Sequence, residues 1–180
     1  MNGLEWICEN LDYRWDGLGS SYTTSSTPSA IYQDNNETLW GWNNRRCGLL
    51  YNLEAMRYLN DTILANSDWR VFTLNDLDSL VIATNSVYDC GLRLCENVDW
   101  SDSSWDGTND LGFNLKPYGA YVNNRTEYKL TGALLHLNVQ GTTKYMVSRR
   151  PSDFEMPNLI TYSTYNAMWF LAIRLCRTLA

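Results

Sequence analysis

The sequence predicts an α+β fold in which two helices come early in the chain and most strands come late. Apolar residues recur at helical spacing between residues 49 and 63, and a second helical pattern starts at Thr73. Side chains then alternate between two faces over residues 133–139, as they do in a strand. We therefore expect a single domain spanning residues 1–180, with a small, mostly antiparallel twisted sheet and many long loops.

The first half of the chain contributes a short strand and both helices. Residues 5–13 are expected to form the strand, and residues 50–65 the first helix. Thr73 can cap the second helix, with Asp76 at the capping-box position, and helix propensity fails near Asn85. The apolar residues that recur in the first helix are Leu49, Leu53, Met56, Leu59 and Ile63, and those facing inward in the second are Leu74, Leu77 and Val81.

The second half of the chain contributes loops and strands. From Gly91 onward Gly, Asn and Asp punctuate the sequence, and residues 100–107 read as a long ordered loop. A strand over residues 133–139 is expected to pair with residues 145–148 across a hairpin turn, and residues 167–177 form the last strand. One face of the first of these strands carries Ala133, Leu135, Leu137 and Val139, the other carries Leu134, His136 and Asn138, and the last strand places Trp169, Leu171, Ile173 and Leu175 on one face.

Five short phrases occur in a fixed order from one end of the chain to the other. They are WICENLDY at 6–13, GLLYNLEA at 48–55, WRVFTLNDL at 69–77, GTNDLGFNLKPYG at 107–119 and AIRLCR at 172–177. Together they resemble the Fibrobacter succinogenes major paralogous domain, a surface module common among Bacteroidetes and their phages.

The resemblance spans nearly the whole chain and implies a C-type-lectin-like fold in which the first and last strands pair. The chain departs from the family pattern at Phe72, where the family usually has Pro, and at Leu77, where it usually has Trp. An aromatic phrase expected after the central loop, which is the phrase at residues 107–119, is replaced by LHLN at 135–138. The residues expected to hold the fold are Trp6, Trp69, Gly107, Gly112 and Phe113, the last of which should fill the core.

Charge and hydropathy exclude two classes of partner. The net charge of −6 argues against nucleic acid, because duplex binding needs a basic face that neutralises phosphates. The longest apolar run, residues 167–173, is too short to cross a bilayer.

The chain opens with MNGLE, without the pattern of a signal peptide, so we expect a complete phage gene product.

The residues with reactive side chains do not form a metal or catalytic motif. His136 is the only histidine, and it lacks a partner for a hydrolase triad, so we expect it to be structural or merely exposed. Asp99, Asp102, Asp106 and Asp110 crowd one loop; a calcium site and paired catalytic carboxylates are weaker interpretations than a solvated turn. We expect no enzymatic activity, no cofactor and no metal. The five cysteines are Cys8, Cys47, Cys90, Cys95 and Cys176; buried free thiols are favoured, although Cys8 and Cys176 could approach each other.

The segment between residues 119 and 169 is rich in Tyr, Asn and Arg, which recognise sugars and protein surfaces at low entropic cost. In related lectin-like proteins the binding face lies just before the closing strand, so the resemblance implies such a face here. An equal alternative is that many of these residues only cover a small sheet. The ligand- or partner-binding residues expected are Tyr145, Arg149, Arg150, Tyr162, Tyr165, Asn166 and Trp169.

These observations predict a non-enzymatic virion protein of a Bacteroidetes phage, located on the tail or another exposed appendage. It would bind other virion proteins and, as a further partner, a host surface glycan or protein. Appendages usually repeat cyclically, so a homo-oligomer is expected. The alternative is an extracellular module of a bacterial cell-surface adhesin or lipoprotein.

Overall fold

The computed structural model describes residues 3–20, 27–31, 48–85, 90–96, 107–122, 125–127, 132–139, 142–149, 160–164 and 169–179. Within these residues the fold is mixed α+β, and most strand pairs are antiparallel, as the sequence predicts. The helical elements are α1 (Leu53–Tyr58), η2 (Leu59–Ile63), α2 (Leu74–Thr84) and α3 (Cys90–Leu94). The strands are β1 (Leu4–Trp6), β2 (Ala30–Ile31), β3 (Leu50–Tyr51), β4 (Arg70–Val71), β5 (Ala120–Val122), β6 (Arg125–Glu127), β7 (Gly132–Val139), β8 (Thr142–Arg149), β9 (Ile160–Thr164), β10 (Leu171–Ala172) and β11 (Leu175–Thr178).

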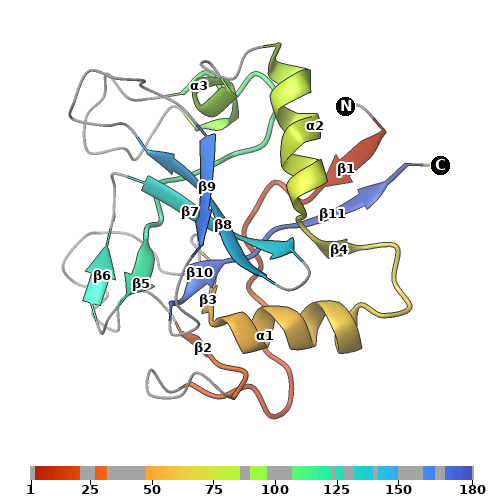
Figure 1. The fold of residues 1–180 in the computed structure, drawn as a ribbon, viewed down its shortest axis with the longest axis vertical. Helices are drawn as coiled ribbons and strands as arrows, with labels where there is room; N and C mark the ends of the chain where they lie inside the picture. Colours follow the sequence, from red (N-terminus) through yellow and green to blue (C-terminus); the bar gives the residue numbers. More distant parts are fainter. Residues whose placement is uncertain are drawn as a thin grey trace.

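The first and last strands pair, which brings the two ends of the chain together. β11 lies between β1 and β4 in a three-stranded antiparallel sheet, with Glu5 opposite Arg177. A hydrogen bond from Leu179 N to Gly3 O extends this pairing, and Figure 1 shows the two termini side by side. This pairing is the one that the family resemblance implies.

The strand predicted over residues 5–13 is shorter than expected. Regular pairing ends at Trp6, although Ile7 N still donates to Leu175 O and Leu11 N donates to Ile173 O. The opening segment therefore continues alongside the closing segment as irregular backbone. Leu11 O also accepts a hydrogen bond from Leu49 N, so this backbone joins the ends of the chain to the start of the helical region.

A six-stranded sheet crosses the middle of the molecule in the order β2-β3-β10-β7-β8-β9 (Figure 1). The predicted hairpin is confirmed, but its arms are longer than expected, because β7 and β8 pair from Gly132 opposite Arg149 to Val139 opposite Thr142. β10 pairs with β7 in parallel. The segment predicted as one closing strand is two strands, β10 and β11, which belong to different sheets.

The first helix differs from its prediction at both ends. Leu50 and Tyr51 form β3, and Asn52 then caps α1 by accepting a hydrogen bond from Ala55 N through its side chain. The last part of the predicted helix is a π-helical turn, in which Leu64 N donates to Leu59 O.

The second helix follows its prediction closely. The Thr73 side chain accepts from Asp76 N, and the Asp76 carboxylate accepts from Thr73 N, so both halves of the capping box are present. The helix ends at Asn85, which adopts a left-handed conformation with φ 57°. The short helix α3 was not predicted, because Gly91 interrupts a segment with no helical periodicity.

Two clusters of buried apolar side chains form the core, one on each side of β7. Alternate residues of this strand, including Leu135 and Leu137, join the cluster beneath α2, whereas Leu134 joins the cluster beneath α1. This confirms the predicted alternation. The apolar face predicted for the last strand is also confirmed, because Leu171, Ile173 and Leu175 all belong to the second cluster.

Candidate functional site

The predicted binding residues lie around the outer strands of the larger sheet. Tyr145 of β8 lies opposite His136 of β7 on one side and Ser163 of β9 on the other. Tyr162 lies opposite Met146, one register position away, so the backbones of Tyr145 and Tyr162 are close. The register therefore places two of the predicted residues on neighbouring strands at the β9 edge.

The other predicted binding residues are less closely grouped. Arg149 lies at the far end of β8, opposite Gly132. Trp169 precedes β10, and its half-buried ring packs against the second core cluster, on the other side of β7 from β8 in the strand order. Arg150, Tyr165 and Asn166 lie outside the described residues.

The residues expected to hold the fold lie in or against the core. Phe113 is fully buried, and the ring of Trp6 meets it edge to face at a centroid distance of 5.6 Å. Phe72, one of the departures from the family pattern, is also fully buried and lies 6.1 Å from Phe113, centroid to centroid. Trp69 is partly buried against the second cluster, and the Arg177 guanidinium lies 4.9 Å from its ring centroid.

The central loop depends on two glycines and one asparagine. A Cβ at Gly107 would lie 2.1 Å from Cys95 O, so any side chain at this position would collide with the backbone. Gly112 has φ +65°, and Asn109 also has a positive φ while its Oδ1 accepts from Asn114 N. These contacts turn the loop so that Phe113 points into the core.

Arg174 is the residue that sequence reasoning missed. Its guanidinium is fully buried, lies 4.5 Å from the Phe113 ring centroid, and donates to Asn10 Oδ1 at 2.9 Å. It also donates to the carbonyl oxygens of Phe113 and Asn114. A single side chain thereby joins the opening, central and closing segments. An arginine in the apolar phrase at 172–177 is the signal that could have identified it.

The buried Arg174 remains a cation at neutral pH. Loss of water lowers the pKa of its guanidinium to about 10, while nearby groups including Tyr118, Glu9 and Glu96 act in the opposite direction. Lys116 Nζ lies 3.7 Å from a Glu9 carboxylate oxygen and 3.5 Å from a Glu96 carboxylate oxygen. The two carboxylates therefore lie close to two cations, Lys116 and the buried Arg174.

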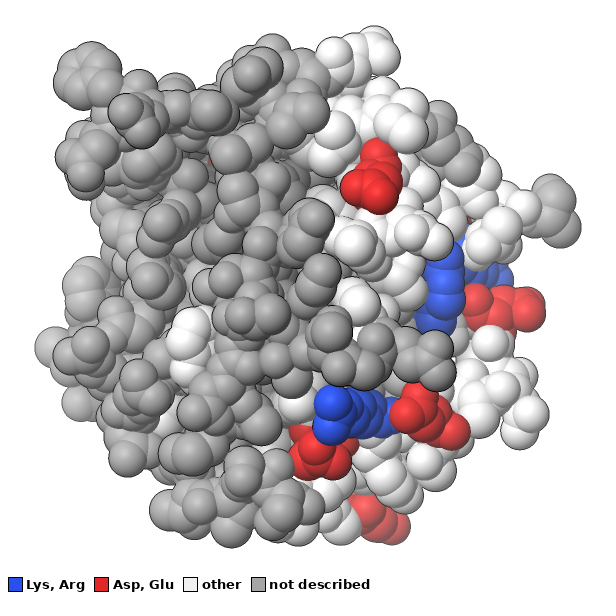
Figure 2. All heavy atoms as spheres, in the orientation of Figure 1, with Lys and Arg blue, Asp and Glu red and all other residues white. Residues whose placement is uncertain are grey.

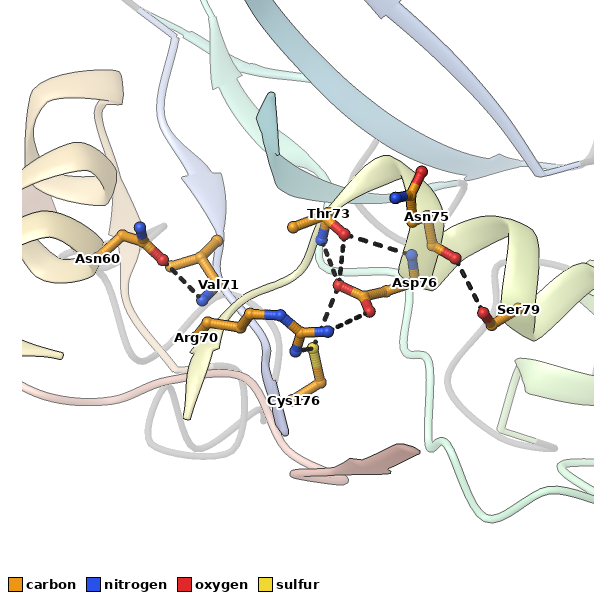
Figure 3. Close-up of polar contacts among 8 residues, drawn as sticks. All are labelled: Asn60, Arg70, Val71, Thr73, Asn75, Asp76, Ser79 and Cys176. Atoms are coloured by element: carbon orange, nitrogen blue, oxygen red, sulfur yellow. Dashed lines mark hydrogen bonds and ion pairs between the residues drawn. The ribbon is translucent and has the colours of Figure 1, made fainter. Parts of the chain in front are cut away.

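A second, partly buried polar cluster joins β4, α2 and β11 (Figure 3). Arg70 donates to Asp76 Oδ1 at 2.6 Å and to Cys176 Sγ at 2.8 Å, and Cys176 Sγ lies 3.4 Å from Asp76 Oδ2. Burial, and then the negative charge of Asp76, raise the pKa of the Cys176 thiol to about 12. The thiol is consequently protonated at neutral pH, and it is poorly suited to act as a nucleophile or a metal ligand.

The described cysteines are free thiols, and the prediction that they are also buried holds for all of them except Cys8. Cys90, Cys95 and Cys176 are buried, whereas Cys8 is exposed. Cys47 lies outside the described residues.

His136 is fully buried, and its ring contacts the backbone of Tyr51, a member of the second core cluster. Its Nε2 lies 2.6 Å from Tyr51 O, and since the carbonyl oxygen is an acceptor, Nε2 carries the proton. Burial lowers the pKa of the imidazole to about 4, partly offset by this hydrogen bond. Of the two roles left open for His136, the structure therefore supports the structural one.

No group of three or more His, Cys, Asp or Glu side chains within the described ranges could hold a metal ion. Of the acidic loop only Asp110 is described, and it accepts a hydrogen bond from Arg93 at 3.1 Å. Hydrogen bonding from Thr108, and then from Arg93, lowers the pKa of this carboxyl. On the face of the molecule seen in Figure 2, the coloured Lys and Arg side chains also lie beside Asp or Glu side chains.

The part of the chain described here contains no helix that is both long and apolar enough to cross a membrane. Comparison with models of known protein families found no match, and no curated protein or solved structure matches the chain.

Proposed function

We propose that this chain is a non-enzymatic binding protein with a C-type-lectin-like fold. In this proposal it is a virion component of a phage that infects a Bacteroidetes host, located on the tail or another exposed appendage. It binds other virion proteins and, through the region around β8 and β9, a host surface glycan or protein.

The observation that carries this proposal is the meeting of three family-like phrases at Arg174. Asn10 belongs to the opening phrase, Phe113 and Asn114 to the central loop, and Arg174 to the closing phrase. Residues that are 60 or more positions apart in the sequence thus form one contact network, as expected if the phrases mark a common framework. The pairing of β1 with β11 supports the same fold.

The state of the reactive side chains supports a binding role over catalysis. His136 is neutral at pH 7, fully buried and hydrogen-bonded to the backbone, so it is poorly placed to exchange protons with a substrate. The Cys176 thiol is buried, with a strongly raised pKa. Both side chains contribute to packing, and neither is poised for nucleophilic or acid-base chemistry.

The proposal is tested by fractionating an infected culture. Particles are separated from envelope fragments on a density gradient, and peptides of this chain are quantified by mass spectrometry in each fraction. We expect the peptides to peak with infectious titre. A peak confined to the envelope fraction would instead support the second candidate, a cell-surface adhesin.

Assembly is a separate part of the proposal. A virion appendage is built by cyclic repetition, so the purified chain should form a symmetric homo-oligomer. Light scattering at micromolar concentration measures its mass directly, and a clean monomer would count against this part.

A further inference from the structure

A cluster of four aromatic rings lies where the opening segment meets β3 and α1. The ring of Trp15 is nearly parallel to that of Tyr51, at 5° and a centroid distance of 6.0 Å, and to that of Tyr58, at 22° and 5.9 Å. Tyr13 lies 6.1 Å from Trp15 at 36°. Centroids about 6 Å apart with near-parallel planes mean that the rings are displaced sideways, forming a stepped stack.

The stack is held from within by Tyr51, which is fully buried. The Tyr51 hydroxyl accepts a hydrogen bond from Tyr13 N at 3.0 Å and donates one to Tyr13 O at 2.8 Å. Both contacts are to the backbone of Tyr13, so its ring is free to face outward on a fixed main chain. A ligand would therefore meet a surface that is already ordered, which lowers the entropic cost of binding.

The outer members of the stack are exposed to solvent. Tyr13 is 47% exposed and Tyr58 is 41% exposed. Among the described residues, they are the only aromatic side chains in the set of exposed large hydrophobic residues, and both lie beside Trp15. The two exposed rings therefore present flat apolar surface on one ordered stack.

The chemistry of this surface fits a neutral carbohydrate. The apolar C–H faces of sugar rings pack against flat aromatic rings, and their hydroxyl groups donate hydrogen bonds to carboxylates. Asp16 is exposed and follows Trp15 directly in the sequence, so it can provide such an acceptor. The net charge of −6 disfavours a polyanionic ligand.

The size of the surface also argues against a second protein as its occupant. A large aromatic side chain buries about 150–250 Å², so two half-exposed tyrosines offer about 200 Å² together. A stable protein interface buries about 800 Å² on each partner.

We propose that Tyr13, Trp15 and Tyr58 form a binding site for a neutral glycan chain. The site is distinct from the region around β8 and β9, since β3 is separated from β8 by β10 and β7 in the sheet. The inference goes beyond the proposed function, and it holds for either a virion protein or an adhesin.

The test is native gel electrophoresis of the purified full chain in gels cast with mannan, xylan, laminarin or soluble starch. We expect at least one polysaccharide to retard the wild-type protein. Tyr13→Ala and Tyr58→Ala should each raise the apparent Kd about tenfold, whereas Tyr58→Phe, which keeps the ring, should bind as the wild type does.

The matched control is Ile82→Ala, which removes an exposed apolar side chain from α2 and should leave retardation unchanged; Ile82 is 66% exposed. Thermal melts confirm that each variant is folded, and if one tyrosine variant unfolds, the other gives the same readout.

Retardation by none of the four polysaccharides, or equal retardation of the tyrosine and control variants, would overturn the proposal. So would a wild-type oligomer that dissociates in Tyr58→Ala, because the surface would then be a protein contact. Particle fractionation is independent of these results, so failure here is distinguishable from failure of the proposed function.

Discussion

Replacement of Arg174 by methionine tests how the chain is held together. Methionine keeps much of the side-chain volume but donates no hydrogen bond. The carbonyl oxygens of Phe113 and Asn114 therefore lose the guanidinium, as does Asn10 Oδ1. Each buried acceptor that loses its donor costs about 1–3 kcal/mol. The two carbonyls together give an expected loss of about 4 kcal/mol in the free energy of unfolding, which is a large part of the stability of an ordinary domain.

The matched control is Arg177→Met on the same closing segment. Arg177 is partly exposed, pairs with Glu5 at 2.6 Å and lies over the Trp69 ring. A partly exposed ion pair contributes at most about 1 kcal/mol, because water screens the charges. Urea unfolding followed by tryptophan fluorescence measures both variants, with the free energy extrapolated to water. Equal losses in the two variants, or a loss below about 1 kcal/mol in Arg174→Met, would refute the reasoning.

Three further predictions follow from the buried groups. The wild-type protein should lose about 2 kcal/mol of stability between pH 7 and pH 5 because of His136. Over this range the imidazole binds a proton in the unfolded chain, where its pKa is the ordinary 6.5, but not in the folded protein, where its pKa is about 4. In urea titrations at both pH values His136→Gln should show little of this change, and an unchanged dependence would contradict the account. Phe113→Ala should cost about 3–5 kcal/mol, and Trp69→Ala less since its ring is only partly buried; equal costs in urea unfolding would argue against the core described. Iodoacetamide should label the exposed Cys8 in the folded protein and reach the buried Cys176 only after unfolding. Peptide mass spectrometry measures both labelling rates, and similar rates would contradict the burial of Cys176.

Features set by nearby residues could be predicted from the sequence. The capping box of α2 needs only Thr73 and Asp76, three positions apart, and the helix ends at Asn85 as expected. The alternation in β7 likewise follows from the strand repeat. Local backbone geometry decides these features, so a short stretch of sequence contains the information.

Features set by distant contacts could not be predicted. The closing segment is interrupted between β10 and β11, where Arg174 reaches Asn10 and the central loop. In the π-helical turn, Asn60 Oδ1 accepts a hydrogen bond from Val71 N, eleven residues away. Helical spacing does not contain these contacts, so it predicts a longer helix and an unbroken strand. The aromatic stack was missed for the same reason, since Tyr51 and Tyr58 meet Trp15 only in the fold.

Immunogold microscopy tests the central claim most directly. An antibody against this chain is applied to purified particles and to host cells. The account predicts label on the particles, and its position would separate a host-binding role at a tail tip from a structural role at the neck or head. Label confined to the cell envelope would contradict the virion role and leave the adhesin.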